Sequence, residues 1–361
     1  MICPISFIKF LKKKKIDFFS GVPDSVLKNF TENIPIEKNY IMANEGLALS
    51  LGIGYFLKTK KIPLIYFQNS GLGNTINPLI SIAHKNVYSI PMLLLIGWRG
   101  APNSKDEPQH IQQGKKTLNF LKNLGIKSVT LNSEKNFSKL NKLIKFSRGQ
   151  SVPVAILIKK DTFDKTKKAI IRNNYKLERI KVLKFLLDNV SQKTKIFSST
   201  GYISRELDYV MRNKKKKIKS FYNVGGMGHT SSIALGYSIN SKDKTLCLDG
   251  DGALMMHMGS LANIGKFSKK NFVHILLNNG THESVGGQPT NSNLINFKAL
   301  SKSVKYKEYC SIKNEKELKS KFSKFIKKNG PLFCEIFIKN KSIKNLGRPK
   351  DLDKLKRYFI R

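Results

Sequence analysis

Residues 246–283 read LCLDGDGALMMHMGSLANIGKFSKKNFVHILLNNGTHE and carry the clearest indication of the fold. Two apolar runs within it, 246–248 and 272–277, have the length of buried strands, and a helix-like segment separates them. A strand–helix–strand order predicts two parallel strands whose carboxyl ends meet at the same edge of a sheet. Asp251 follows the first run and Asn279 the second, so we expect the two side chains to lie close together.

The residue types at this edge suit a hard cation. A carboxylate, an amide oxygen and a backbone carbonyl freed by the glycine turns are ligands that Mg²⁺ accepts, with water and phosphate oxygens completing its octahedron. Gly-Asp-Gly alone is most often an ordinary loop turn. A second strand that ends in Asn-Asn-Gly, at the interval which the motif requires, favours the cation site.

The GDG and the NN that follows it resemble the diphosphate and magnesium motif of the thiamine diphosphate-dependent enzymes. The resemblance implies that Asp251, Asn279 and the backbone of Thr281 hold Mg²⁺. It also implies that the glycine turn contacts the cofactor diphosphate through Gly250, Gly252 and Ala253.

One carboxylate in the first half is a candidate catalyst. Residues 40–46 predict a short strand that ends in Glu45, at the start of a helix rich in small residues. A lone glutamate there more often serves as a favourable charge against the helix dipole. The resemblance implies instead that Glu45 binds the cofactor at pyrimidine N1′ and promotes its activation, with burial raising the pKa of the carboxyl toward the working range.

Two further segments match the family at the cofactor. Ser199 and Thr200 lie in a hydroxyl-rich turn before a helix, which is a generic anion site that the resemblance assigns to the diphosphate. Met227 follows Gly226 in a glycine-rich segment, where core packing is the ordinary role of a methionine. The resemblance makes Met227 the apolar prop between the two cofactor rings.

The first half narrows the resemblance to the phosphonopyruvate decarboxylases, a group of thiamine diphosphate-dependent 2-oxo acid decarboxylases. The segments that carry it are GVPDS (21–25), ANEG (43–46), YFQNSGLGNTIN (66–77), YSIPMLLLIGWRG (88–100) and KDEPQH (105–110). We expect the last of these to be a polar excursion after a strand. An isolated arginine on a loop is usually a solvated charge, yet a guanidinium suits a phosphonate or carboxylate. The candidate substrate contacts are Asp24, Ser25, Gln68, Asn69, Arg99, His110 and His282.

Length and pattern predict two α/β domains of the thiamine diphosphate-binding fold, each a mainly parallel sheet with helices on both faces. We expect a pyrimidine-type domain at 1–163, a linker at 164–176 and a diphosphate-type domain at 177–361. The chain is too short for a middle domain between them.

The formal net charge of +42 arises from 66 Lys and Arg against 24 Asp and Glu. Because the lysines are spread through nearly every polar segment, we favour a solvated basic surface over a nucleic-acid site. The four cysteines show no paired metal spacing. With neither a secretory signal nor a long apolar run, we expect a cytoplasmic protein without a membrane span.

The resemblance therefore implies an enzyme that uses thiamine diphosphate and Mg²⁺ to convert 3-phosphonopyruvate to phosphonoacetaldehyde and CO₂ in phosphonate biosynthesis. The resemblance implies at least a homodimer, with the cofactor at the chain interface. Three alternatives stay open: a sulfopyruvate decarboxylase, another 2-oxo acid decarboxylase or carboligase, and an inactive polyanion-binding protein. The last would show salt-sensitive nucleic-acid binding and no turnover.

Overall fold

The computed structural model describes residues 1–166, 172–214, 217–343 and 345–361. The chain forms two compact units, Met1–Ile170 and Ile171–Arg361. The boundary between them falls within the predicted linker 164–176, of which residues 167–171 lie outside the described part of the chain. Within the described ranges, no helix is both long and apolar enough to span a bilayer.

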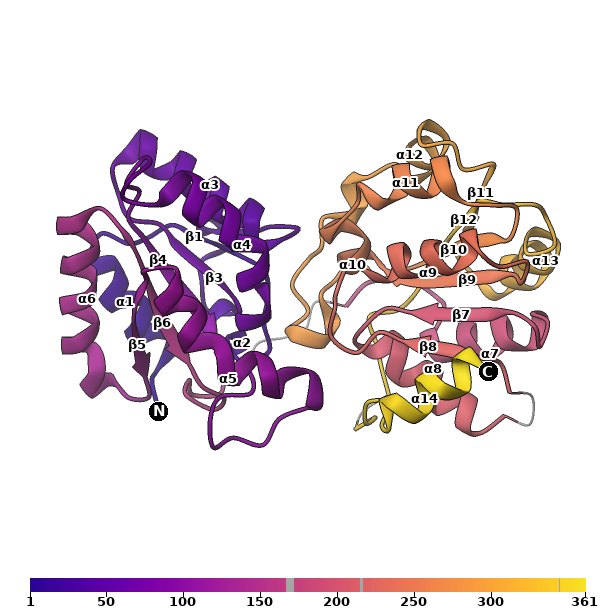
Figure 1. Cartoon of the computed structure of the whole chain (residues 1–361), viewed down its shortest axis with the longest axis horizontal. Helices are drawn as coiled ribbons and strands as arrows, with labels where there is room; N and C mark the ends of the chain where they lie inside the picture. The colour runs from indigo at the N-terminus through magenta and orange to yellow at the C-terminus, as the bar shows by residue number, and fades with distance from the viewer. Residues whose placement is uncertain (167–171, 215–216, 344) are drawn as a thin grey trace. The chain divides into compact units, whose positions relative to one another are not determined.

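The first unit is built on a six-stranded sheet in the order β2-β1-β3-β4-β6-β5, in which every neighbouring pair is parallel (Figure 1). The strands are β1 (Phe19–Gly21), β2 (Asn39–Ile41), β3 (Leu64–Gln68), β4 (Met92–Gly97), β5 (Lys127–Leu131) and β6 (Pro153–Ile158). The helices are α1 (Pro4–Lys13), α2 (Lys28–Thr31), α3 (Glu45–Thr59), α4 (Leu72–Pro78), α5 (Pro108–Asn123) and α6 (Phe137–Gln150).

Alternating side chains on the central strands create two cores in this unit. On β3, Leu64 and Tyr66 face a cluster that includes residues of α1, α2 and α6, whereas Ile65 and Phe67 face a cluster with α3, α4 and α5. Because both faces are covered, β3 is apolar along nearly its whole length.

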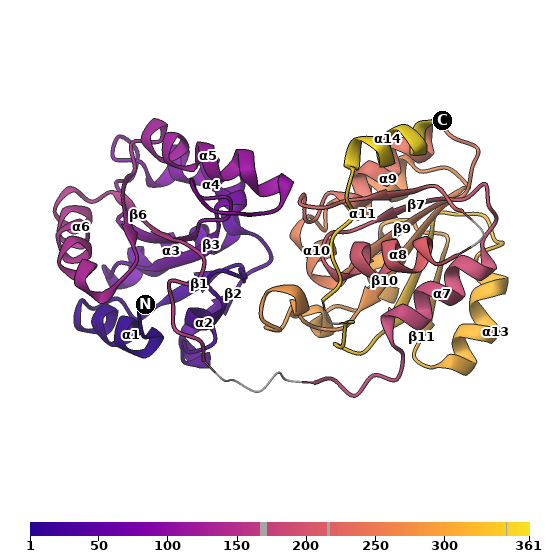
Figure 2. The ribbon, with the colours of Figure 1, turned by 90° about the horizontal axis from the view of Figure 1, so that it is seen from below.

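The second unit repeats this plan in the order β11-β12-β10-β9-β7-β8, again with parallel neighbours. Its strands are β7 (Lys195–Ser198), β8 (Ser220–Tyr222), β9 (Thr245–Gly250), β10 (Phe272–Asn278), β11 (Glu308–Ile312) and β12 (Leu332–Phe337). Its helices are α7 (Arg179–Asn189), α8 (Tyr202–Arg212), α9 (Thr230–Ile239), α10 (Asp251–Met256), α11 (Ser260–Phe267), α12 (Phe297–Ser303), α13 (Glu315–Phe325) and α14 (Leu352–Ile360). The apolar cluster on one face contains residues of α7, α8 and α13, and that on the other contains residues of α9, α11, α12 and α14. Figure 2 shows α9 and α14 on the opposite side of this sheet from α7 and α13.

The predicted fold, two parallel α/β sheets with no middle domain between them, is therefore confirmed. The pairing of β9 with β10 in register, from Thr245 opposite Phe272 to Gly250 opposite Leu277, brings both strands to an end at the same edge. Asp251 then begins α10, and Asn279 follows β10 directly. This register places the two motif residues side by side, as the strand–helix–strand pattern requires.

The prediction of a polar excursion at 105–110 is wrong from residue 108 onward. There α5 begins, with Pro108 in the first turn, and continues for 16 residues. Proline suits the first turn because its missing N–H would have no helical partner there. The buried positions of α5 are His110, Gly114, Thr117 and Leu121. Only one of these four is a large apolar residue, so the sequence does not show the apolar repeat by which a helix is predicted.

Candidate active site

Asp251 lies at the centre of a polar cluster in the second unit. Its side chain is 2% exposed, and its Oδ2 accepts hydrogen bonds from the hydroxyls of Thr290 and Ser292, the latter at 3.2 Å. Burial raises the pKa of Asp251 to about 6, and these hydrogen bonds oppose the shift. A buried carboxylate whose hydrogen bonds do not fully offset the cost of burial binds a cation strongly.

The two asparagines after β10 have different surroundings. Asn278 donates from Nδ2 to Glu335 at 2.8 Å and accepts the Gly280 N–H at 3.1 Å, so it braces the turn. Asn279 accepts the Thr281 N–H at its Oδ1 at 3.0 Å and lines an open hollow. Only the second asparagine is therefore placed to offer an oxygen to a ligand in that hollow.

The hollow is lined by most of the residues predicted to bind the cofactor. Those that line it are Ser199, Thr200, Met227, Gly250, Asp251, Gly252, Ala253, Asn279 and Thr281. His282, which was predicted as a substrate contact, lines it as well. Gly226 is not among the lining residues; its N–H donates to the Asn223 side chain at 3.0 Å and helps to shape the loop before Met227.

The hollow fits a diphosphate group with a hard cation. The hydroxyls of Ser199 and Thr281 are buried and have no hydrogen-bond partner among the described residues, so they are free to bond a ligand oxygen. Helix α8 begins at the hollow, where its first N–H groups favour an anion. The backbone at Gly252 lies close to the His282 ring, and a Cβ at this position would lie only 2.8 Å from it. Glycine is therefore required there.

Several residues of this region were missed by sequence reasoning. Arg179, Tyr202, Glu283 and Ser284 line the hollow. Arg179 is only 3% exposed and its guanidinium forms ion pairs with Glu206 at 3.1 Å and with Glu283. Glu283 stands close to the NN motif in the sequence and could have been noticed there, whereas no local pattern distinguishes Arg179 from the other basic residues.

In the first unit, Glu45 is the first residue of α3, and the preceding Asn44 caps the helix by accepting the Leu47 N–H at 2.9 Å. The Glu45 carboxyl is buried and accepts a hydrogen bond from Asn74 Nδ2 at 2.7 Å. Burial raises the pKa of Glu45, and the hydrogen bonds from Asn74 and from the backbone of Glu45 itself only partly offset this shift. Gly71 leaves the space for this carboxyl, since a Cβ there would lie 2.3 Å from Oε1.

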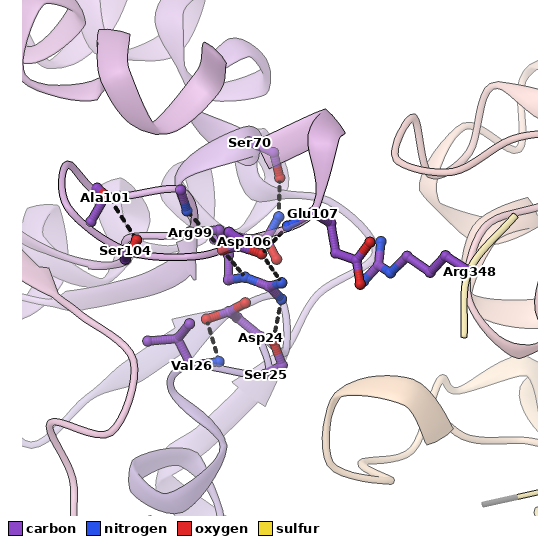
Figure 3. Close-up of polar contacts among 12 residues, drawn as sticks. Asp24, Ser25, Val26, Ser70, Arg99, Ala101, Ser104, Asp106, Glu107 and Arg348 are labelled. Atoms are coloured by element: carbon purple, nitrogen blue, oxygen red, sulfur yellow. Dashed lines mark hydrogen bonds and ion pairs between the residues drawn. The ribbon is translucent and has the colours of Figure 1, made fainter. Parts of the chain in front are cut away.

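A second cluster in the first unit surrounds Arg99 (Figure 3). Its guanidinium bonds Asp106 with two nitrogens, one of them at 2.7 Å, and donates to the Ser25 hydroxyl at 3.0 Å. Burial alone would raise the pKa of Asp106, but hydrogen bonds from Arg99 hold this pKa below its usual range. Arg99 is thus a fixed, partly buried cation rather than a solvated surface charge.

Asp24 lies beside this arginine and is buried. Its Oδ2 accepts the N–H groups of Val26 and Leu27 at 2.9 and 3.2 Å, while its Oδ1 has no hydrogen-bond partner among the described residues. Burial raises the pKa of Asp24 to about 6 despite the nearby Arg99 charge. A carboxyl with a pKa of about 6 can exchange a proton near neutral pH, and Oδ1 is the oxygen left to do so.

The other predicted substrate contacts are placed differently. Asn69 is fully buried, and its carboxamide bonds the main-chain N–H and carbonyl of Arg99 as well as the Thr117 hydroxyl, so it positions the arginine instead of facing a ligand. Gln68 donates to Ser70 at 2.6 Å. His110 is buried within α5. His282 lines the hollow of the second unit, where burial lowers its pKa to about 4 and keeps it neutral.

Both units match known families. Residues 6–120 match the model of the thiamine pyrophosphate enzyme N-terminal TPP binding domain, and residues 200–336 match the C-terminal TPP binding domain. Thiamine pyrophosphate is the same molecule as thiamine diphosphate. The two matches together cover more than half of the chain, which belongs to the thiamine pyrophosphate-dependent decarboxylases.

Within that class, the chain is similar to phosphonopyruvate decarboxylases. It is 28% identical to the phosphonopyruvate decarboxylase of Streptomyces viridochromogenes over 352 residues, which cover 92% of this chain and 87% of that enzyme. The sulfopyruvate decarboxylase of Methanosarcina acetivorans is 27% identical, with 78% of this chain and 77% of that enzyme covered. The sulfopyruvate decarboxylase subunit beta of Methanocaldococcus jannaschii is 39% identical over a shorter match of 115 residues, which covers 32% of this chain and 59% of that subunit.

Proposed function

We propose that this protein decarboxylates 3-phosphonopyruvate to phosphonoacetaldehyde and CO₂, using thiamine diphosphate and Mg²⁺, as a step in phosphonate biosynthesis. The observation that carries the choice of substrate is the Arg99 cluster. It is assembled from three of the segments that resemble phosphonopyruvate decarboxylases, those containing Ser25, Arg99 and Asp106. Similarity to such an enzyme over 92% of the chain supports the same choice.

The Arg99 cluster has the chemistry of an anion site. Asp106 holds two guanidinium nitrogens and Ser25 a third, so the planar donors are fixed before a ligand arrives. Because the guanidinium is already fixed, it loses little rotamer entropy when a ligand binds. Its positive charge favours a compact dianion such as a phosphonate. Arg99 would bind and orient the phosphonate. Close by, the Asp24 carboxyl would supply a proton when protonated and receive one when ionised.

Thiamine diphosphate, when bound, supplies a nucleophilic carbon and an electron sink for the departing CO₂. Asp251, Asn279 and the Thr281 carbonyl would hold Mg²⁺ against the diphosphate, and the hydroxyl of Ser199 and the N-terminus of α8 would bind the diphosphate oxygens. Glu45 would exchange a proton with the pyrimidine N1′. Burial raises its pKa, which favours this task because a higher pKa makes the carboxylate a better proton acceptor.

Sulfopyruvate is the second candidate substrate, because sulfopyruvate decarboxylases are also similar to this chain. A sulfonate carries one charge where a phosphonate can carry two, so a fixed guanidinium discriminates between them only in part. The substrate test is a panel of 2-oxo acids incubated with thiamine diphosphate and Mg²⁺, with the products identified by NMR. We expect phosphonoacetaldehyde and a kcat/KM for phosphonopyruvate at least about 10-fold above that for sulfopyruvate. The reverse preference would make the protein a sulfopyruvate decarboxylase, and a ligated product from an added aldehyde would make it a carboligase.

We further propose at least a homodimer, following the family resemblance, with the cofactor at the interface of two chains. Analytical ultracentrifugation of the full-length protein tests this. A species with the mass of one chain at micromolar concentration, in the presence of thiamine diphosphate and Mg²⁺, would exclude it.

A further inference from the structure

Asn279 is held on two sides, by Asn173, which precedes α7, and by Glu283, which follows in the same loop. Its main-chain carbonyl accepts a hydrogen bond from Asn173 Nδ2 at 2.8 Å, and the same amide also donates to the Ile338 carbonyl at 3.1 Å. On the other side, the Asn279 Nδ2 donates to Glu283 Oε2 at 3.0 Å. The backbone and the side chain of this residue are therefore fixed independently.

Glu283 is in turn fixed by a buried arginine. Arg179, the first residue of α7, pairs with the same Oε2 of Glu283 that accepts from Asn279. The other end of the guanidinium pairs with Glu206 of α8 at 3.1 Å. The Arg179 side chain is only 3% exposed, so removing it would leave two largely buried glutamates without a counter-charge.

These contacts decide which way the Asn279 carboxamide faces. Its NH₂ group points at the Glu283 carboxylate, and a flipped amide would instead put its oxygen against that negative charge. With the orientation fixed, Oδ1 accepts the Thr281 N–H at 3.0 Å and retains a second lone pair. That lone pair is what a metal ion would use.

We propose that Asn173 and the Arg179–Glu283 pair are positioning residues for Asn279, so that residues 172–179 form one functional unit with the cation-binding loop. This inference rests on the proposed function, in which Asn279 binds Mg²⁺. Because coupling between two sites is reciprocal, a ligand that needs Asn279 in this orientation also stabilises residues 172–179.

The first test measures metal affinity rather than turnover. Binding of Mn²⁺, as a probe for Mg²⁺, to the full-length protein with thiamine diphosphate is followed by the EPR signal of the free ion. Asn173→Ala and Glu283→Ala should each weaken Mn²⁺ binding by about 10- to 100-fold, the range for residues that orient a metal ligand. Glu283→Gln, which keeps an acceptor oxygen, should recover part of the loss.

The matched control is Asn189→Ala, because Asn189 also donates its amide to a main-chain carbonyl, that of Phe185, but on the exposed side of α7. It should leave Mn²⁺ affinity unchanged. If Glu283→Ala fails to fold because Arg179 loses a partner, Asn173→Ala still tests the proposal, since it removes no charge.

The second test reads the coupling in the opposite direction. Arg172 and Lys176 are exposed trypsin sites that flank Asn173. Thiamine diphosphate with Mg²⁺ should slow cleavage at both sites in the wild type, and this protection should be lost in Glu283→Ala.

Wild-type protein that binds Mn²⁺ while both alanine variants bind it equally well would overturn the inference and leave the proposed function standing. Wild-type protein that binds neither ion nor cofactor would instead refute the proposed function. An equal loss in Asn189→Ala would show that the effect is general to the unit and would also overturn the inference.

Discussion

Replacing Gly71 by alanine should disable Glu45 without touching its chemistry. A Cβ at Gly71 would lie 2.3 Å from Glu45 Oε1 and 2.5 Å from its Cδ, whereas ordinary contact begins at 3.4 Å. The backbone tolerates alanine, since φ at Gly71 is −76°. The clash must therefore be relieved by the Glu45 carboxyl, which has to move by about 1 Å and lose its bond to Asn74.

The displacement sets the expected magnitude. Moving a catalytic group by about 1 Å costs roughly 100-fold in rate, equivalent to about 2.7 kcal/mol in the activation free energy. Overpacking and the lost hydrogen bond should lower the free energy of unfolding by about 1–3 kcal/mol. Steady-state kinetics with phosphonopyruvate and thermal unfolding of the same preparation measure the two effects.

Gly73→Ala is the matched control, because a Cβ there meets nothing within 4 Å and the residue lies in α4. This variant should keep wild-type turnover and gain up to about 1 kcal/mol from better helix propensity. In a Glu45→Ala background, Gly71→Ala should destabilise the fold less than in the wild type, since the clashing carboxyl is gone. Wild-type turnover and stability in Gly71→Ala would refute the placement of the Glu45 carboxyl.

Three further predictions concern the substrate and diphosphate residues. Arg99→Lys should raise KM for phosphonopyruvate by about 10- to 100-fold and change kcat by less than about 3-fold, because a lysine cannot reproduce the planar contacts. An unchanged KM would show that Arg99 does not bind the substrate. Asp24 has a folded pKa raised to about 6, so its favourable contribution to stability is present below pH 4 and lost as pH rises through 6. In denaturant titrations, Asp24→Asn should therefore gain up to about 3 kcal/mol relative to wild type between pH 4 and pH 7, and a pH-independent difference would contradict the shift. Gly252→Ala should weaken thiamine diphosphate binding at least about 10-fold in calorimetric titrations, because the added Cβ would lie 2.8 Å from the His282 ring. Gly236→Ala is the control and should bind the cofactor normally, because a Cβ at Gly236 would meet nothing within 4 Å.

Local sequence was enough to predict the core of the fold and the motif loop. The apolar runs at 246–248 and 272–277 correspond to β9 and β10, and their parallel pairing places Asp251 next to Asn279. Such runs are informative because a strand buried on both faces is apolar along its length. Helix α5 escaped prediction because its buried face is made of small and polar residues.

The parts of the site that sequence could not supply depend on contacts between distant residues. Arg99 was a candidate, but its two-nitrogen contact with Asp106 and its support by Asn69 required the folded sheet. The pairing of Arg179 with Glu283 spans 104 residues and follows from no local pattern. Asn69 was expected at the substrate, and its burial shows that a polar residue in a motif can serve another motif residue instead.

Glu45 is proposed to drive a thiamine diphosphate-dependent decarboxylation, and its replacement by glutamine tests this role. CO₂ release from phosphonopyruvate is measured for wild type and for Glu45→Gln, each saturated with thiamine diphosphate and Mg²⁺, with cofactor affinity determined in parallel. We predict steady turnover in the wild type and at least a 100-fold lower kcat in the variant, at a cofactor affinity within about 10-fold of wild type. Undiminished turnover in Glu45→Gln, or no CO₂ from folded wild-type protein that binds the cofactor, would contradict the account.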